Sequence, residues 1–295
     1  MTKVAFYIMN NKGYVTLRGF VERYGADAIA YIVTSQDKAL RKDYHDEILT
    51  LAKKFKIKIF DRSENLGDLE DDQNIYKFAI GWRWIISKEE RLVVFHDSIL
   101  PKYRGFAPLV NSLINKEKEI GVTALIASND YDEGDIISQK KLKIDYPIKI
   151  NKAIKVITPL YLELVDEVYK KIKSNEKIRL KKQDHDSATY SLWLNSDDYF
   201  IDWSWDAERI KRFVDSVGYP YDNAKAKLEL QTIKFVDVEI VDDVFIENRA
   251  RHLGKIIFKR DGHPVVVCSS GLLKLIDIRD CEDKTININF RSKFI

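Results

Sequence analysis

The sequence predicts an α/β protein, with a Rossmann-like, mostly parallel sheet and flanking helices, followed by a smaller, β-rich, OB-like carboxy-terminal domain. Three observations predict this fold. The chain of 295 residues is long enough for two ordinary domains with sizeable cores. In its first half, short apolar runs alternate with amphipathic runs, which is typical of a sheet built from β-α-β units. In its last third, short apolar runs alternate with turn residues instead.

The strands of the first domain are predicted from short runs rich in apolar and β-branched residues, because parallel strands are buried on both faces. These runs cover residues 4–8, 28–33, 56–60, 92–96 and 122–127. Residues 41–55 carry apolar side chains at helical spacing, which predicts an amphipathic helix between two of the strands.

A second helix is expected over residues 150–173, where apolar residues again recur at helical spacing. Pro159 interrupts this pattern. It either kinks one long helix or lies in the first turn of a second helix that Thr158 caps. The sequence leaves both alternatives open.

The boundary between the domains is predicted where residues 170–182 carry seven basic residues and one acidic residue. We interpret this run as a solvated helix end plus linker. The predicted organisation is therefore a catalytic domain over 1–175, a linker over 176–200 and a carboxy-terminal domain over 201–295. In the last domain we expect a short helix over 209–214 and strands over 234–240, 255–258, 265–267 and 272–276, with a turn at Asp261-Gly262.

Composition and motifs exclude several classes of protein. No apolar run approaches the roughly 18 residues of a membrane span, and the start of the chain lacks the pattern of a signal peptide. A cytoplasmic protein is the simplest expectation. Cys268 and Cys281 form neither a disulfide framework nor a zinc pattern, so no metal is expected. The stretch from Asn10 to Gly13 lacks G-x-G-x-x-G, which argues against a dinucleotide cofactor.

His96 is the first candidate site residue, because it ends a strand that is otherwise apolar. Ligands of open parallel sheets bind outside the carboxyl ends of the strands, and the pKa of imidazole lies near neutrality. A second apolar run ends in an acidic loop that contains Asp130, Asp132 and Asp135, with a glycine at Gly134. One of these carboxylates is expected to meet His96 and to stabilise its protonated form.

Several motifs resemble the formyltransferase family that uses 10-formyltetrahydrofolate, which includes methionyl-tRNA formyltransferases and sugar N-formyltransferases. HDSILPKYRG from His96 to Gly105, then GVTAL, then DEGDI from Asp132 to Ile136 resemble the family patterns H-x-S-L-L-P-x-x-x-G and D-x-G-D. Asp202-Trp203-Ser204 and the β-rich tail resemble the carboxy-terminal domain of the tRNA enzymes. The similarity covers most of the chain.

The resemblance implies that His96 is the catalytic histidine and Asp132 its partner. In the implied reaction an acceptor amine attacks the formyl carbon of 10-formyltetrahydrofolate, and tetrahydrofolate leaves. Donors near the formyl oxygen would stabilise the charge that develops there. The folate contacts implied are Trp84, Ile85, Ile86, Asp132 and Asp135, and the substrate contacts implied are Ser98, Lys102 and Arg104.

One position departs from the family pattern. The family usually has an asparagine two residues before the histidine, where this chain has Val94. Valine has no side-chain donor, and loss of one oxyanion donor typically lowers a rate by about a hundred- to a thousandfold. Either another group substitutes, such as Ser98, the Trp84 indole, backbone amides or the acceptor itself, or the protein is a non-catalytic, folate-binding paralogue.

The acceptor is expected to be a small molecule. Residues 201–295 carry 16 basic and 16 acidic residues, whereas a tRNA-binding domain should carry an excess of Lys and Arg. We therefore expect a nucleotide-linked amino sugar of polysaccharide biosynthesis, and no nucleic acid or membrane partner. A methionyl-tRNA formyltransferase is the alternative. The resemblance also admits a homodimer, because sugar formyltransferases are often dimers.

Overall fold

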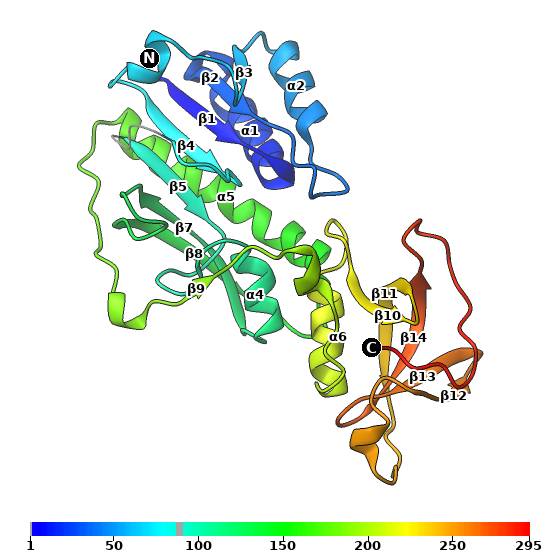
Figure 1. Cartoon of the computed structure of the whole chain (residues 1–295). Helices are drawn as coiled ribbons and strands as arrows, with labels where there is room; N and C mark the ends of the chain where they lie inside the picture. The colour runs from blue at the N-terminus through cyan, green and yellow to red at the C-terminus, as the bar shows by residue number, and fades with distance from the viewer. Residues whose placement is uncertain (1, 87–90) are drawn as a thin grey trace. The chain divides into compact units, whose positions relative to one another are not determined.

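The computed structural model describes residues 2–86 and 91–295, and the chain forms two compact units (Figure 1). The first unit comprises Met1–Ser112, Lys118–Ile144 and Ala153–Leu192, and the second comprises Leu113–Glu117, Asp145–Lys152 and Trp193–Ile295. Residues 176–192, which follow the longest helix, are therefore part of the first unit.

The first unit is built on a seven-stranded sheet. Its strands lie in the order β3 (Ile59–Asp61), β2 (Ile29–Thr34), β1 (Val4–Ile8), β4 (Tyr76–Ile80), β5 (Leu92–His96), β7 (Glu119–Ile126) and β8 (Ile136–Lys143). The first five strands are parallel, and β7 and β8 run antiparallel to their neighbours. All five residues of β1 are buried. The strand order reverses between β1 and β4. Sheets of this kind bind ligands in the crevice at such a reversal, outside the carboxyl ends of the strands.

All five predicted strands of this sheet are present, and the mostly parallel arrangement is confirmed. Two strands, β4 and β8, were not predicted. β4 contains Lys77, which is only 3% exposed. This charged side chain interrupts the apolar run, so the sequence did not indicate a central strand. β8 lies at the edge of the sheet, and its sequence IISQKKLK lacks the continuous apolar run of a strand buried on both faces.

The helices of the chain are α1 (Asn10–Tyr24), α2 (His45–Lys54), α3 (Asp68–Asp71), α4 (Pro108–Ile114), α5 (Ile150–Lys173) and α6 (Ala207–Ser216). Helix α2 begins later than predicted, because Tyr44 has a φ of 61° and cannot continue a right-handed helix. Pro159 lies inside one continuous helix, α5, where the neighbouring Thr158 hydroxyl donates to the carbonyl of Ile154. No helix of the described residues is long and apolar enough to cross a membrane.

The second unit contains a five-stranded antiparallel sheet, as the β-rich prediction requires. Its order is β10 (Ala224–Leu228), β11 (Gln231–Val241), β14 (Leu272–Arg279), β13 (His263–Val267) and β12 (Ile256–Arg260). The predicted turn joins β12 to β13: Asp261 and Gly262 have φ of 53° and 81°, as a two-residue hairpin of type I′ requires. β10 was not predicted, because the sequence AKAKL reads as polar.

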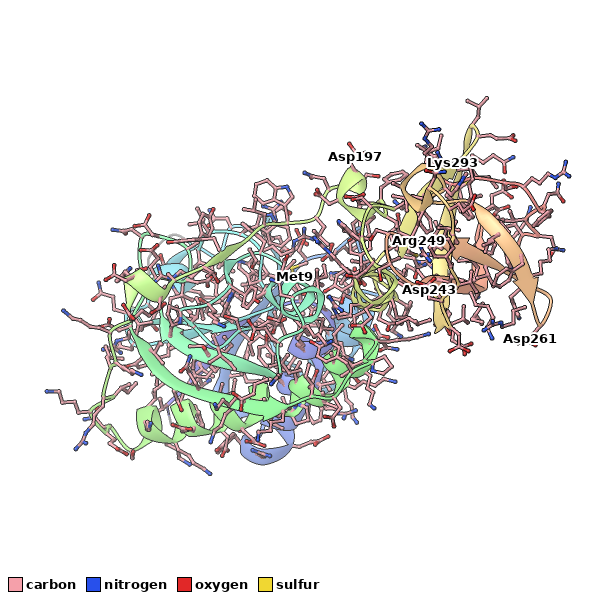
Figure 2. All side chains as sticks on the ribbon, turned by 90° about the horizontal axis from the view of Figure 1, so that it is seen from below. Met9, Asp197, Asp243, Arg249, Asp261 and Lys293 are labelled. Carbon is pink, nitrogen blue, oxygen red and sulfur yellow. The ribbon has the colours of Figure 1, made fainter. Side chains whose placement is uncertain are left out.

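A polar contact joins two loops of this unit. The guanidinium of Arg249 donates to the carboxylate of Asp243 and to the carbonyls of Cys268 and Gly271 (Figure 2). The other oxygen of Asp243 accepts a hydrogen bond from the backbone N–H of Gly271. This pair therefore fixes the loop before β14 against the loop that follows β11.

Candidate active site

His96 is the last residue of β5, so its ring lies at the carboxyl edge of the sheet, where it is 7% exposed. Its Nε2 lies 2.7 Å from the backbone carbonyl oxygen of Tyr103, which can only accept, so the Nε2–H donates there. Its Nδ1 lies 3.4 Å from Oδ2 of Asp132. The structure therefore brings together the two residues that the sequence singled out as the catalytic pair.

Asp132 is held in the loop between β7 and β8. Its Oδ2 also accepts a hydrogen bond of 2.9 Å from the backbone N–H of Gly105. Gly134 allows this loop to close, because a Cβ at this position would lie 1.7 Å from the carbonyl oxygen of Ile126. The glycine of the DEGDI motif is thus required for a close backbone approach that sets the position of Asp132.

Ser98 and Arg104, two of the residues expected to contact substrate, are 2% and 1% exposed. The Ser98 hydroxyl donates to the carbonyl of Lys102 at 2.7 Å, and its own carbonyl accepts from the hydroxyl of Thr123. These bonds brace the turn that follows His96. Lys102, the third expected contact, is an exposed side chain.

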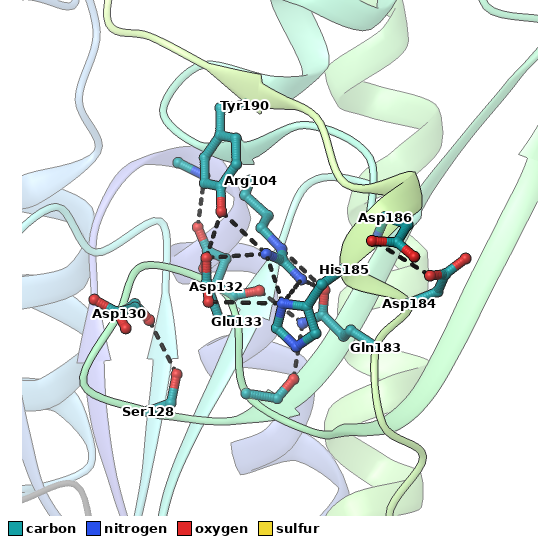
Figure 3. A network of polar contacts seen from close by, with 12 residues as sticks. Arg104, Ser128, Asp130, Asp132, Glu133, Gln183, Asp184, His185, Asp186 and Tyr190 are labelled. Atoms are coloured by element: carbon teal, nitrogen blue, oxygen red, sulfur yellow. Dashed lines mark hydrogen bonds and ion pairs between the residues drawn. The ribbon is translucent and has the colours of Figure 1, made fainter.

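The buried guanidinium of Arg104 is the centre of a polar network (Figure 3). Its partners include the side-chain oxygen of Gln183, the carboxylate of Glu133 and the hydroxyl of Tyr190. The hydrogen bond from Tyr190 and the charge of Arg104 lower the pKa of Glu133, which keeps this carboxylate ionised beside the guanidinium. Arg104 therefore links the acidic loop to residues near 183–190.

The segment expected to face folate follows β4 and carries two tryptophans. Trp84 is half-buried beneath the guanidinium of Arg62, whose central carbon lies 4.3 Å from a ring centroid. Ile85 is 74% exposed, whereas Ile86 is 8% exposed. The indole N–H of Trp82 is buried with no hydrogen-bond partner in the described part of the chain. The exposed side chain of Ile85 can lie against a flat ring, whereas the Trp82 N–H is enclosed by protein.

Sequence reasoning missed a polar pair beside His96. The ammonium of Lys12, in the first turn of α1, bonds the carboxylate of Asp97, and these side chains are 12% and 10% exposed. Oδ1 of Asp97 has no partner within residues 2–86 and 91–295. The signal that could have found Lys12 is the polar stretch Asn10-Asn11-Lys12 directly after a buried strand. Across the same described ranges, no group of three or more His, Cys, Asp or Glu residues could hold a metal ion.

Two family models match the chain. One, described as formyl transferase, matches residues 76–153, and the other, described as formyl transferase, C-terminal domain, matches residues 194–292. Together they cover more than half of the sequence, and the first includes both His96 and Asp132. The chain belongs to the formyl transferase family. The resemblance predicted from HDSILPKYRG and DEGDI is thereby confirmed.

Curated members of the formyl transferase family with similar sequences include methionyl-tRNA formyltransferases. The enzyme of Thermotoga neapolitana is 35% identical over 150 residues, which are 50% of this chain and 46% of the relative. The chain therefore spans about half the length of that relative. The enzyme of Streptococcus equi subsp. equi is 27% identical over 289 residues, with 93% of this chain and 90% of the relative covered.

Solved structures with the same fold include sugar enzymes. The N-formyltransferase of Helicobacter canadensis, solved with folinic acid and dTDP-3-aminofucose, has a TM-score of 0.68 and 17% identity, over 93% of this chain and 99% of that one. WlaRD, a sugar 3N-formyl transferase, has a TM-score of 0.63 and 20% identity, over 93% of this chain and 97% of its own. At these levels of identity, the two structures show that this chain shares their fold.

Proposed function

We propose that the protein is an N-formyltransferase that moves a formyl group from 10-formyltetrahydrofolate to the amine of a nucleotide-linked amino sugar. The observation that carries the proposal is the contact of 3.4 Å between His96 and Asp132 at the carboxyl edge of the sheet. Membership of the formyl transferase family supports the reaction class. We also propose that the reaction takes place in the cytoplasm.

The donor is proposed to lie against the segment after β4 and the acidic loop, with Trp84, Ile85, Ile86, Asp132 and Asp135 holding it. The exposed side chain of Ile85 offers an apolar contact to its pterin ring. When bound, the donor supplies the activated formyl group. The chain supplies the groups that orient this donor and move the proton.

His96 is proposed to take the proton that the attacking amine loses. Because Nε2–H donates to the carbonyl of Tyr103, the neutral ring carries its lone pair on Nδ1. A proton accepted at Nδ1 creates a cation beside the carboxylate of Asp132, which stabilises it. The N–H of Gly105 holds that carboxylate in place. A positioned acid–base group of this kind contributes about 10²–10⁴-fold in rate.

The formyl oxygen needs a donor other than residue 94. Val94 lies two residues before His96 and packs against Leu100, Leu125 and Ile136, with no polar atom on its side chain. Of the substitutes considered, the Ser98 hydroxyl already donates to the carbonyl of Lys102. We therefore assign the role to the Trp84 indole, backbone amides or the acceptor itself.

Two observations favour a sugar acceptor. Two structural neighbours that align with nearly the whole chain are sugar N-formyltransferases, and residues 201–295 carry equal numbers of basic and acidic residues. The curated relatives favour the other candidate, a methionyl-tRNA formyltransferase. Phosphate contacts would dominate binding of tRNA, and a neutral domain offers few of them.

The deciding experiment incubates the purified protein and 10-formyltetrahydrofolate with a panel of amino-sugar nucleotides or with charged initiator tRNA. Mass spectrometry then detects the formylated product. Formylation of a sugar nucleotide, without salt-sensitive tRNA binding, is the expected result. Efficient formylation of the tRNA would establish the second candidate instead. No product with any acceptor, together with retained folate binding, would identify a non-catalytic paralogue.

A further inference from the structure

We propose that Gln183 is a positioning residue for formyl transfer, and that Gln183 and Thr189, both in the segment of residues 181–191, hold the contacts of His96 in place. The inference rests on the proposed function, because it assigns a role in that reaction. Neither the family motifs nor the predicted site include Gln183, which is 6% exposed. Three independent sets of hydrogen bonds carry the proposal.

The first set joins Gln183 to the loop of Asp132. Its side-chain nitrogen donates to the carbonyl of Asp132 at 2.7 Å and to the carbonyl of Gly134 at 2.8 Å. Both donors of the amide are therefore used on the backbone that carries the carboxylate partner of His96. A side chain without these donors would leave two carbonyls of the loop without their partner.

The second set joins Gln183 to Arg104. The amide oxygen accepts from Nε of Arg104 at 3.1 Å and from Nη2 at 2.9 Å (Figure 3). The remaining Nη1 donates to the carboxylate of Glu133 at 2.9 Å and to the hydroxyl of Tyr190 at 3.1 Å. A charge buried this deeply needs such partners, and loss of the Gln183 oxygen would remove two of the hydrogen bonds of the guanidinium.

The third set joins the same segment to the other contact of His96. The hydroxyl oxygen of Thr189 accepts from the backbone N–H of Tyr103 at 2.9 Å, and the Thr189 carbonyl accepts from the N–H of Arg104 at 2.8 Å. The carbonyl of Tyr103 in turn binds Nε2 of His96. Here the short strands β6 (Arg104–Gly105) and β9 (Tyr190–Ser191) pair side by side.

Both ring nitrogens of His96 are thus positioned by one segment that lies nearly ninety residues further along the chain. Gln183 holds the loop of Asp132, whose carboxylate faces Nδ1 of His96. Thr189 holds Tyr103, whose carbonyl accepts from Nε2 of His96. A displacement of about 1 Å between reacting groups can lower a rate by about a hundredfold. We therefore expect loss of the Gln183 donors to reduce turnover without removing any group that touches substrate.

Two variants distinguish the role of the acceptor oxygen of the Gln183 amide from the role of its donor nitrogen. Gln183→Glu keeps an oxygen for Arg104 and removes the donors to the acidic loop, whereas Gln183→Met removes both at similar size. Lys182→Met, at the exposed neighbouring position, is the matched control. Each variant is measured for kcat, for KM of donor and acceptor, for thermal stability, and for the ¹⁵N chemical shifts of the His96 ring, which report where its proton lies.

We expect Gln183→Glu and Gln183→Met each to lower kcat by about ten- to a hundredfold, the scale of misplaced reacting groups. Their KM values should stay within about twofold, and the His96 shifts should move. Lys182→Met should match the wild type. Folded Gln183 variants with wild-type kcat and wild-type shifts would overturn the proposal, as would kcat losses explained wholly by a smaller folded fraction.

The experiments distinguish failure of the positioning role of Gln183 from failure of the proposed formyltransferase function. If the wild type forms no product with any acceptor, the proposed function fails, and the His96 shifts still test the positioning role. If Gln183→Met does not fold, Gln183→Glu and Thr189→Val are used instead. Thr189→Val has the same shape as the wild-type side chain and removes the acceptor for Tyr103, so unchanged shifts in both variants contradict the inference.

Discussion

Oδ2 of Asp132 faces Nδ1 of His96 at 3.4 Å and accepts the backbone N–H of Gly105 at 2.9 Å. One carboxylate oxygen therefore contacts both the His96 ring, the proposed acid–base group, and the backbone of the segment that follows it. The N–H of Gly105 holds the Asp132 carboxylate in place, and in the proposed reaction its charge would stabilise a proton added to the ring. Loss of this charge should therefore affect proton transfer more than it affects folding.

The first prediction concerns the catalytic pair. His96→Asn and Asp132→Asn should each lower turnover by at least about a hundredfold, because each removes a positioned acid–base group or its counter-charge. Steady-state kinetics and thermal unfolding check the effect on activity and on folding. Asp130→Asn, two residues away in the same loop and exposed, is the matched control and should keep full activity. Near-full activity in a folded His96→Asn protein would show that the site assignment is wrong.

The sequence predicted those parts of the structure that depend on local patterns. Strands such as Val4–Ile8 and Leu92–His96 are continuous apolar runs because they are buried on both faces, so composition alone marks them. β4 escaped prediction because Lys77 lies within it. Asp132 was identified through a motif whose glycine leaves room for a close backbone approach.

Contacts between distant positions carried no comparable signal. Lys12 reaches Asp97 across 85 residues, and Gln183 reaches Asp132 across 51. Neither residue belongs to a periodic pattern, and nothing in the sequence links either of them to its distant partner. Arg104 is a different case: the family resemblance implied a substrate contact there, and the structure shows its guanidinium buried with internal partners. Only the tertiary fold distinguishes these roles.

A second prediction concerns stability against pH. Burial acts to raise the pKa of Asp166, but hydrogen bonds from Lys170 and Tyr24 outweigh it and hold the pKa below its usual range. A lowered pKa stabilises the fold above the unfolded pKa, near 4, and this stabilisation is lost as the pH falls through the folded value. Asp166→Asn should thus lower Tm by about 3 °C at pH 7, the shift for roughly 1 kcal/mol.

Thermal unfolding at pH 7 and below pH 4 checks this prediction. The difference between wild type and Asp166→Asn should shrink as the pH falls. Glu163→Gln, at an exposed position of the same helix, serves as the control for a lost surface charge. A difference of the same size at both pH values would contradict the assignment.

A third prediction concerns the two thiols. Cys268 is fully buried, and burial raises its pKa to about 12, so almost no thiolate forms at pH 8. Cys281 is exposed. A thiol reagent should therefore modify one cysteine in the native protein and two in denaturant, as mass spectrometry can count. Native Cys281→Ser should stay unmodified. Rapid native labelling of Cys268 would mean that the segment directly after β13 opens readily.

The last prediction concerns Val94, where the chain departs from the family pattern. In a working enzyme the formyl oxygen finds its donor elsewhere, and the Val94 side chain serves to pack against Leu100, Leu125 and Ile136. An asparagine amide placed among these apolar side chains without a partner would cost about 1–3 kcal/mol. Val94→Asn should therefore give no large gain in turnover and should lower the free energy of unfolding, while Val94→Ala controls for lost packing. The test is to measure turnover of the wild type, Val94→Asn and Val94→Ala on a panel of amino-sugar nucleotides. A rise of about a hundredfold in Val94→Asn, the scale of one oxyanion donor, would refute a substitute donor and identify the wild type as a protein that has lost its catalytic asparagine.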